Sequence, residues 1–266
     1  MRNKQHGFTL VEVSLFLAIT GLLFVGIITG VQNSMFQQRY NDSVQSFAEF
    51  LRSIYSQTSN VQNSNGNGRS NRVVYGRLVV FGETNKLDGS TSNNDGTVFA
   101  YDVIGKENGA FSGSIKEVIK KLELNVVEES DSPLKYAGNV EEYHPRWGAS
   151  IQSTNSNQLF YGAILVIRHP SSGTIHTLVK TTPANTDGIY KINNTVNSAG
   201  STADDIRNLF NNWDGFDINE VDFCINPNGN QHSQTRRNIR MIANARNASG
   251  IETIDQDSND NKCRTP

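Results

Sequence analysis

Residues 7–31 read GFTLVEVSLFLAITGLLFVGIITGV, and this stretch decides how the rest of the chain can be placed. After Glu12 it contains no charge, and its only polar side chains are those of Ser14, Thr20 and Thr29. At about 1.5 Å per residue, a helix over 13–31 would be about 28 Å long, close to the roughly 30 Å hydrocarbon core of a bilayer. The stretch therefore predicts a transmembrane helix.

The residues on either side of this span predict its orientation and its length. The leader MRNKQHG carries Arg2 and Lys4 and no acid, so the positive-inside rule keeps it in the cytoplasm and sends the rest of the chain outward. No small-residue cleavage site of a secretory signal peptide follows the apolar run. Instead, apolar residues recur at helical spacing and extend the predicted helix to about Gln57: Val44, Phe47, Phe50, Leu51 and Ile54.

The segment from Gly7 to Glu12, GFTLVE, resembles the processing site of type IV prepilins and pseudopilins. The resemblance implies that a membrane peptidase cuts between Gly7 and Phe8 and methylates the new amino terminus. Residues 1–7 would then be a cleaved leader and 8–57 the pilin helix. A carboxylate within apolar surroundings needs a cationic partner, so Glu12 is expected to pair with the freed amino group of a neighbouring subunit during assembly. The alternative is a plain N-terminal membrane anchor.

Residues 60–266 are predicted to form one β-rich head domain. Short apolar and β-branched runs bounded by Gly, Asn, Pro or Ser predict strands at Arg72–Phe81, Thr97–Ile104, Leu159–Arg168, Thr174–Lys180, Glu220–Ile225 and Asn238–Ala243. The third and fourth runs, separated by HPSSG, predict an antiparallel hairpin. Helical spacing predicts two short helices, after Ser114 and after Thr202. The expected class is α+β: a long N-terminal helix, then a mainly antiparallel β head with two short helices and a C-terminal disulfide loop.

The two cysteines, Cys224 and Cys263, are expected to form this disulfide, because the exported head meets an oxidising compartment. In the chain-entropy description, closing this loop stabilises the fold by about 4 kcal/mol. The resemblance supports the pairing, since pilins often carry a C-terminal disulfide loop. The spacing is unlike that of a CxxC redox pair.

Composition and motifs argue against an enzyme. The chain has 24 basic and 26 acidic residues, which excludes a globally basic nucleic-acid coat protein. It contains no HExxH, GxSxG, P-loop or GxGxxG motif, so we nominate no catalytic or cofactor-binding residue. His169 and His176 could face each other across the hairpin, but two imidazoles alone make a poor metal site.

Two polar clusters are candidate binding sites whose ligands the sequence does not determine. Asp255, Asp257 and Asn259 place oxygen ligands at alternate positions, as calcium loops do, although the EF-hand template is not met. A solvated acidic tail is the preferred interpretation, so no cofactor is predicted and calcium is the alternative. A window without acids, Ile225–Ile251, contains basic residues that could contact DNA phosphates or a neighbouring subunit: Arg236, Arg237, Arg240 and Arg246.

The C-terminal region also resembles, more narrowly, the GspH/FimT-type minor pilins. Phe223, Pro227 and Gly229 match a strand that ends in a Pro–Gly turn, and Ile239–Ala243 with Arg246 match a strand that leads into a basic stretch. The compact Gly-Arg-x-Arg ending of DNA-binding members is absent.

Together these features predict a structural subunit of a type IV pilus-like filament, most simply a minor pilin. A pseudopilin of type II secretion and a DNA-binding minor pilin of a competence pilus are the alternatives. The partners implied by the resemblance are other pilin or pseudopilin subunits, the prepilin peptidase, an inner-membrane assembly platform and, before assembly, membrane lipid. The expected location is the bacterial cytoplasmic membrane, crossed once with the head outside, and then an extracellular or periplasmic filament.

Overall fold

The chain divides into two compact units, Met1–Asp42 and Ser43–Pro266. The computed structural model describes residues 9–60, 62–63, 73–81, 96–105, 113–124, 126–127, 135–136, 140–154, 160, 162–181, 220–227, 236–242, 245–255, 259–260 and 262–263. The long helix α1 (Leu10–Ser59) contributes residues to both units. Each unit is described below by itself.

Helix α1 extends to Ser59, which confirms the predicted long N-terminal helix. Its character changes along its length. Within the first unit, the apolar side chains from Leu10 to Phe36 are exposed. From Ser43 onward, one face is buried at spacings of three and four residues, which is the period expected when one side of a helix packs on a sheet: Val44, Phe47, Ala48, Leu51, Ile54 and Tyr55. The last turns of α1 are therefore part of the head.

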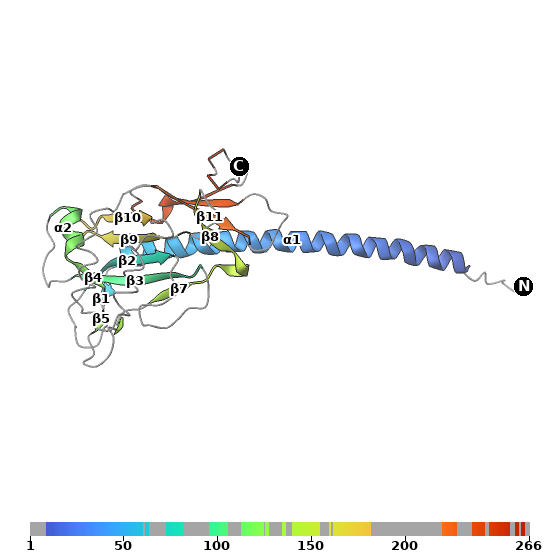
Figure 1. The fold of residues 1–266 in the computed structure, drawn as a ribbon, viewed down its shortest axis with the longest axis horizontal. Helices are drawn as coiled ribbons and strands as arrows, with labels where there is room; N and C mark the ends of the chain where they lie inside the picture. The colour runs from blue at the N-terminus through green and yellow to red at the C-terminus, as the bar shows by residue number, and fades with distance from the viewer. Residues whose placement is uncertain are drawn as a thin grey trace, which may run out of the picture. The chain divides into compact units, whose positions relative to one another are not determined.

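The larger sheet of the head has seven strands and is antiparallel throughout. Its strands follow the order β10-β9-β2-β3-β4, with β1 paired to β2 and β7 paired to β3 (Figure 1). The bounds are β1 Gln62–Asn63, β2 Val73–Phe81, β3 Val98–Gly105, β4 Leu122–Leu124, β7 Glu141–Tyr143, β9 Gly162–Arg168 and β10 Ile175–Thr181. The predicted hairpin is confirmed, since Ile175 of β10 lies opposite Arg168 of β9.

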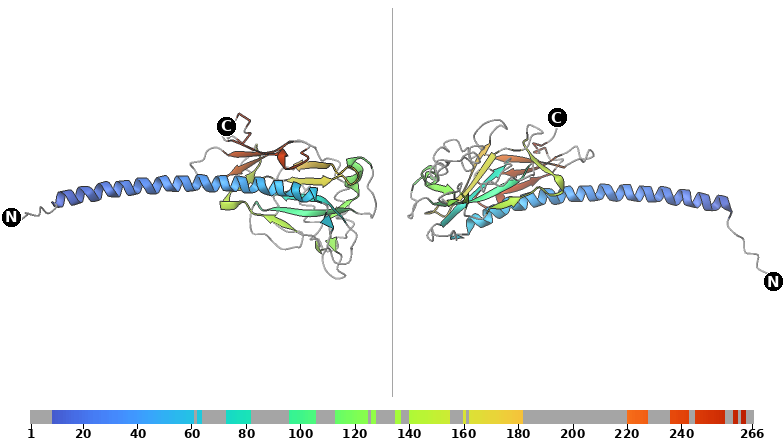
Figure 2. Two further views of the ribbon diagram at one scale, coloured as in Figure 1. Left: turned by 180° about the vertical axis from the view of Figure 1, so that it is seen from behind. Right: turned by 60° about the horizontal axis from the view of Figure 1, so that its bottom comes forward.

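A second antiparallel sheet has four strands in the order β13-β12-β11-β8. Its C-terminal strands are drawn in orange to red in Figure 2. Its bounds are β8 Ser150–Gln152, β11 Val221–Asn226, β12 Arg237–Met241 and β13 Ile251–Ile254. A separate pair joins β5 (Val126–Val127) to β6 (Lys135–Tyr136). Two single-turn 3-10 helices, η1 (Arg146–Gly148) and η2 (Ala248–Gly250), precede β8 and β13.

The larger sheet buries both of its faces because its strands alternate two sets of apolar residues. One face, with Leu78 and Val80 of β2, packs with α2 (Ile115–Lys120) in a buried cluster. The opposite face, with Phe81 of β2 and Thr177 of β10, contacts α1. Sheets buried on both sides read as nearly continuous apolar runs, and this is the pattern of β2 and β9.

An aromatic cluster joins α1 to both sheets. The Phe47 ring of α1 lies 6.2 Å from the Phe81 ring of the larger sheet and 5.5 Å from the Phe223 ring of the smaller one, both edge-on. Phe160 packs against both strand residues, with ring centroids 5.1 Å from Phe81 and 4.8 Å from Phe223. Edge-to-face pairs at these distances are favourable beyond the area that they bury. This cluster holds the helix and the two sheets in one unit.

The predicted first short helix is confirmed as α2, and the Glu117 carboxylate accepts a hydrogen bond of 3.0 Å from the Ser114 amide at its start. Helix α2 ends at Lys120, and Leu122, whose spacing fits the same helix, is the first residue of β4. The predicted helix after Thr202 lies outside the described residues. The long helix, the antiparallel sheets, the few helices and the disulfide confirm the α+β class.

Candidate functional site

The start of α1 is closed by a reciprocal pair of hydrogen bonds between Thr9 and Glu12. The Thr9 amide donates to Glu12 Oε2 at 2.9 Å, and the Glu12 amide donates to Thr9 Oγ1 at 3.3 Å. The Thr9 hydroxyl also donates to Glu12 Oε2, at 3.0 Å. This capping box satisfies two amides that a helix N-terminus leaves open, and the helix dipole favours a carboxylate there. The structure therefore orients Glu12 along its own helix start, a role that the T-x-x-E spacing could have predicted.

Among the described residues of their own unit, nothing packs against the apolar side chains of the first part of α1. Leu10 is 87% exposed, Phe16 68% and Leu22 75%. An apolar surface of this extent marks a membrane or a protein contact. By its length and composition, α1 is long and apolar enough to cross a membrane. This surface requires lipid or other helices around it.

The polar side chains in this span are satisfied by the helix itself. The Ser14 hydroxyl donates to the Val11 carbonyl at 3.0 Å, and the Thr20 hydroxyl donates to the Phe16 carbonyl at 2.8 Å. Thr29 donates to the carbonyls of Val25 and Gly26, each at 3.0 Å. Because a hydroxyl without a partner is costly in an apolar medium, these bonds make the span compatible with a bilayer or a helix bundle.

Hydrogen bonds fix the end of α1 within the head. The Tyr55 hydroxyl lies 2.8 Å from Thr177 Oγ1, and the Thr177 hydroxyl donates to the Ala245 carbonyl at 2.9 Å. Burial raises the pKa of Tyr55 to about 12, partly offset by its hydrogen bond to Thr177. Arg168 of β9 donates to the carbonyl of Ser59 at 2.8 Å, which satisfies one of the open carbonyls of the last turn.

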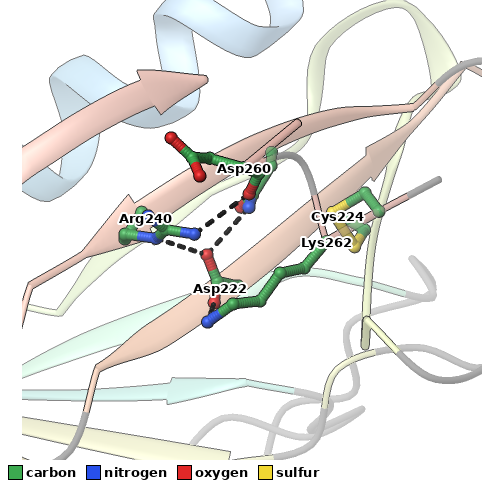
Figure 3. The surroundings of a disulfide bond; sticks show 7 residues. Asp222, Cys224, Arg240, Asp260 and Lys262 are labelled. Carbon is green, nitrogen blue, oxygen red and sulfur yellow. Dashed lines mark hydrogen bonds and ion pairs between the residues drawn. A yellow bond between two sulfur atoms is a disulfide. The ribbon is translucent and has the colours of Figure 1, made fainter. Parts of the chain in front are cut away.

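The predicted disulfide between Cys224 and Cys263 is present, and its Cα atoms are 5.4 Å apart. Both cysteines are buried. A network of charged side chains surrounds the bond on the same face of β11 (Figure 3). Asp222 accepts hydrogen bonds from Arg240 Nε at 2.9 Å and from Asn238 Nδ2 at 2.8 Å, both on β12.

The segment that carries Cys263 supplies the rest of this network. Lys262 Nζ lies 2.8 Å from Asp222 Oδ2 and 2.8 Å from Glu220 Oε1. Arg240 Nη2 donates to the Asp260 carbonyl at 3.1 Å. Burial alone would raise the pKa of Asp222, but the hydrogen bonds from Lys262, Asn238 and Arg240 outweigh it and lower the pKa. The hydrogen bonds to Asp222 and Glu220 raise the pKa of Lys262. Sequence reasoning missed this network because its members lie far apart in the chain.

The four arginines of the predicted basic cluster have different surroundings. Arg236 is buried and Arg237 is half-buried. Arg240 is paired with Asp222 and also lies 3.0 Å from Glu220 Oε1. Arg246, beyond the end of β12, is the exposed member of the four. The window Ile225–Ile251 contains no acid, but Arg240 pairs with two acids that precede it in the sequence, Glu220 and Asp222.

The remaining candidates are placed as follows. Asp255 and Asn259 are exposed, whereas Asp257 lies outside the described residues, so the calcium hypothesis stays a prediction. No group of at least three His, Cys, Asp or Glu side chains suited to a metal occurs in the described part of the chain. The His169 and His176 rings do face each other, 6.2 Å apart, but the ring nitrogens of His169 contact the Gly113 carbonyl and the Ser171 hydroxyl.

Comparison with known proteins identifies the N-terminal segment. The prokaryotic N-terminal methylation motif matches residues 2–28, a range that contains Gly7, Phe8 and Glu12. No curated protein and no solved structure matched the chain. The match confirms the resemblance inferred from GFTLVE and does not distinguish a GspH/FimT-type subunit from other members. The motif, the apolar first helix and the C-terminal disulfide support a type IV pilin-like or pseudopilin-like subunit.

Proposed function

We propose that this chain is a minor subunit of a type IV pilus-like filament, inserted in the cytoplasmic membrane with its head outside and then assembled through α1. The methylation motif supports processing by a prepilin peptidase between Gly7 and Phe8. The exposed apolar part of α1 supports two successive environments, lipid before assembly and neighbouring helices afterwards. The observation that carries the proposal is the combination of this unburied apolar helix with one carboxylate at its start.

Glu12 is the proposed assembly residue. Its Oε2 atom is engaged by Thr9 of the same chain, and within the described part of the chain its Oε1 atom makes no hydrogen bond. Because Thr9 holds the carboxylate through Oε2, Oε1 can accept a hydrogen bond from the amino group of a neighbouring subunit while the bonds to Thr9 remain. In an apolar bundle, an unpaired carboxylate is unfavourable, so pairing with the amino terminus of Phe8 from another subunit would set the register between helices.

A substitution of Glu12 tests the proposal. In the host that makes the filament, Glu12→Ala is expected to reduce the share of this subunit found in sheared filaments, while the amount in the membrane stays the same. The matched control is Glu49→Ala, since Glu49 is an exposed acid on the same helix within the head. Incorporation of the Glu12 variant at the unsubstituted level would contradict the assembly role.

The size of the head favours a minor subunit over a repeating one. A head as long as the unit from Ser43 to Pro266 would crowd its neighbours if it were repeated along a tightly wound fibre. A pseudopilin of type II secretion has the same N-terminal design and is the alternative. Subunit counting by quantitative mass spectrometry tests the minor role, which predicts few copies per filament; hundreds of copies would contradict it. The host's assembly genes distinguish a pilus from a secretion system.

The DNA-binding alternative is the weaker one, because of where its arginines lie. Of Arg236, Arg237, Arg240 and Arg246, the last alone is exposed, and Arg240 is already paired with carboxylates. Phosphate contacts require accessible basic side chains and give binding that falls steeply with salt. We therefore expect no salt-sensitive retardation of DNA by the full chain, and retardation lost in Arg246→Ala would revive this alternative.

A further inference from the structure

The disulfide lies beside an ion pair that joins the same two segments of the chain. Asp222 and Cys224 are two residues apart on β11, so their side chains share one face of the strand. Lys262 and Cys263 are neighbours in the C-terminal segment, of which residues 259–260 and 262–263 are described. The ammonium of Lys262 lies 2.8 Å from the Asp222 carboxylate, and the sulfur atoms are bonded directly alongside (Figure 3). Two links of different chemistry therefore connect β11 to the C-terminal segment.

The half of the network that lies on the sheet does not depend on the C-terminal segment. Asp222 lies opposite Arg240 in the pairing of β11 with β12, and Asn238, two residues before Arg240 on β12, lies opposite Cys224. Both side chains donate to Asp222 within the sheet, at 2.9 Å and 2.8 Å. The Asp222 side chain is only 5% exposed, so its charged state relies on such donors. The Asp222 carboxylate is thus held by donors of its own sheet as well as by Lys262.

The C-terminal segment completes the network at two points. Lys262 adds a cation between Asp222 and Glu220, both at 2.8 Å. The Asp260 carbonyl accepts from Arg240 at 3.1 Å, so the segment contacts the network on both sides of residue 261. Two contacts so close in sequence fix the position of the residue that follows them, which is Cys263. The ionic contacts need no oxidant, whereas the disulfide does.

We propose that Lys262 is a positioning residue for disulfide formation: its ion pairs with Asp222 and Glu220 dock the C-terminal segment on β11 and hold Cys263 against Cys224 before the thiols are oxidised. The oxidant is a disulfide such as glutathione disulfide. The thiolate of Cys263 attacks one sulfur of the oxidant, which forms a mixed disulfide and releases one glutathione thiolate. The thiolate of Cys224 then attacks Cys263 Sγ in the mixed disulfide, which forms the Cys224–Cys263 bond and releases the second glutathione as its thiolate.

The electrons and protons of this step balance. The two cysteines together lose two electrons and two protons, and one glutathione disulfide becomes two glutathione thiols. Docking of the C-terminal segment on β11 raises the effective concentration of the Cys263 thiol at Cys224, because it excludes most conformations in which the two thiols are far apart. By linkage, whatever the ion pairs contribute to disulfide formation, the disulfide contributes equally to the ion pairs.

The test measures this effective concentration in the full-length protein in detergent micelles. The protein is equilibrated with mixtures of reduced and oxidised glutathione, free thiols are alkylated, and the oxidised fraction is read by intact mass. Removing a charge-assisted hydrogen bond to a poorly exposed carboxylate is expected to lower the effective concentration about tenfold in Lys262→Met. Lys262→Arg keeps the charge and is expected to restore most of it. Lys116→Met, at an exposed lysine of α2, is the matched control and should leave the value unchanged.

A second measurement asks whether the segment docks without the disulfide. In the full-length double variant Cys224→Ser, Cys263→Ser, Lys262 should react with an amine-acylating reagent more slowly than Lys116, and salt at about 1 M should reduce this difference by screening the half-exposed ion pair. The proposal is overturned if Lys262→Met has the effective concentration of the unsubstituted protein. It is equally overturned if Lys262 and Lys116 react at the same rate in the double serine variant.

Discussion

Phe47 is the residue at which the helix-to-sheet packing of the head can be tested most sharply. Its side chain is 1% exposed and contacts aromatic rings of both sheets, including Tyr143 of β7, whose ring centroid is 5.5 Å away. Truncating a buried Phe to Ala removes its transfer free energy and leaves a cavity, at a cost of about 3–5 kcal/mol. For a unit of this size, each kcal/mol lowers the melting temperature by about 2–4 °C, so Phe47→Ala should lower it by about 6–20 °C.

The assay is thermal unfolding of the full-length protein in detergent micelles, followed by the near-ultraviolet circular dichroism of the head. The control is Phe36→Ala, because Phe36 is on the same helix but belongs to the first unit and is 45% exposed. That variant is expected to change the free energy of unfolding of the head by less than about 0.5 kcal/mol. A melting temperature unchanged in Phe47→Ala would refute the inference that α1 is an integral part of the head.

Three further perturbations have expected outcomes in the same unfolding assay. Gly76→Ala should cost about 1–3 kcal/mol, because an added Cβ would overlap a backbone carbonyl of β9, whereas Gly21→Ala, with open space around it, should cost nothing in the head. Asp222 has a folded pKa below its ordinary 3.8, so the stability it contributes is present above that value and is lost as the pH falls through the folded pKa; Asp222→Asn should flatten this acid dependence, and an equally steep dependence would contradict it. Tyr55→Phe should cost about 1 kcal/mol, since it removes one hydrogen bond to Thr177 while the Thr177 bond to Ala245 remains; no measurable change would exclude a stabilising bond.

Local patterns in the sequence predicted much of the fold. The apolar run and the periodicity that follows it predicted α1, because both depend on residues within a few turns of one another. Strands β2, β3, β9 and β10 of the larger sheet were predicted for the same reason, since a strand buried on both faces is an uninterrupted apolar run. The short strands β1, β4 and β7 of the same sheet were not predicted. The HPSSG turn predicted the pairing of β9 with β10, which is local in sequence. Each of these features depends on contacts between residues that are close together in the sequence.

Long-range pairings were not predicted, and the network around Asp222 shows why. Asp222 and Lys262 are distant in sequence, and each, taken alone, looks like an ordinary solvated charge. The acid-free window suggested a basic surface because it counted acids along the chain, whereas the acid that pairs with Arg240 lies opposite it in the neighbouring strand. The order of the strands in the smaller sheet likewise depends on contacts between segments such as β8 and β11. The disulfide could be predicted because the chain has only two cysteines.

The assembly role of Glu12 stays a prediction, and the structure adds a hydrogen-bond partner within the chain. Sequence reasoning expected the carboxylate to pair with the amino terminus of a neighbouring subunit and did not identify Thr9. The structure shows that Thr9 supplies two hydrogen bonds to it. The cost of this charge in an apolar setting is therefore partly met within the chain, and its pairing with a neighbouring subunit stays a prediction.

We propose that the chain is processed at its N-terminal motif and assembled through the helix that follows. The intact mass and N-terminal sequence of the protein recovered from filaments of its own host test this directly. We expect a chain that begins at Phe8 and carries one methyl group on its amino terminus. A chain in the cell that retains Met1 and is never found in filaments would contradict it.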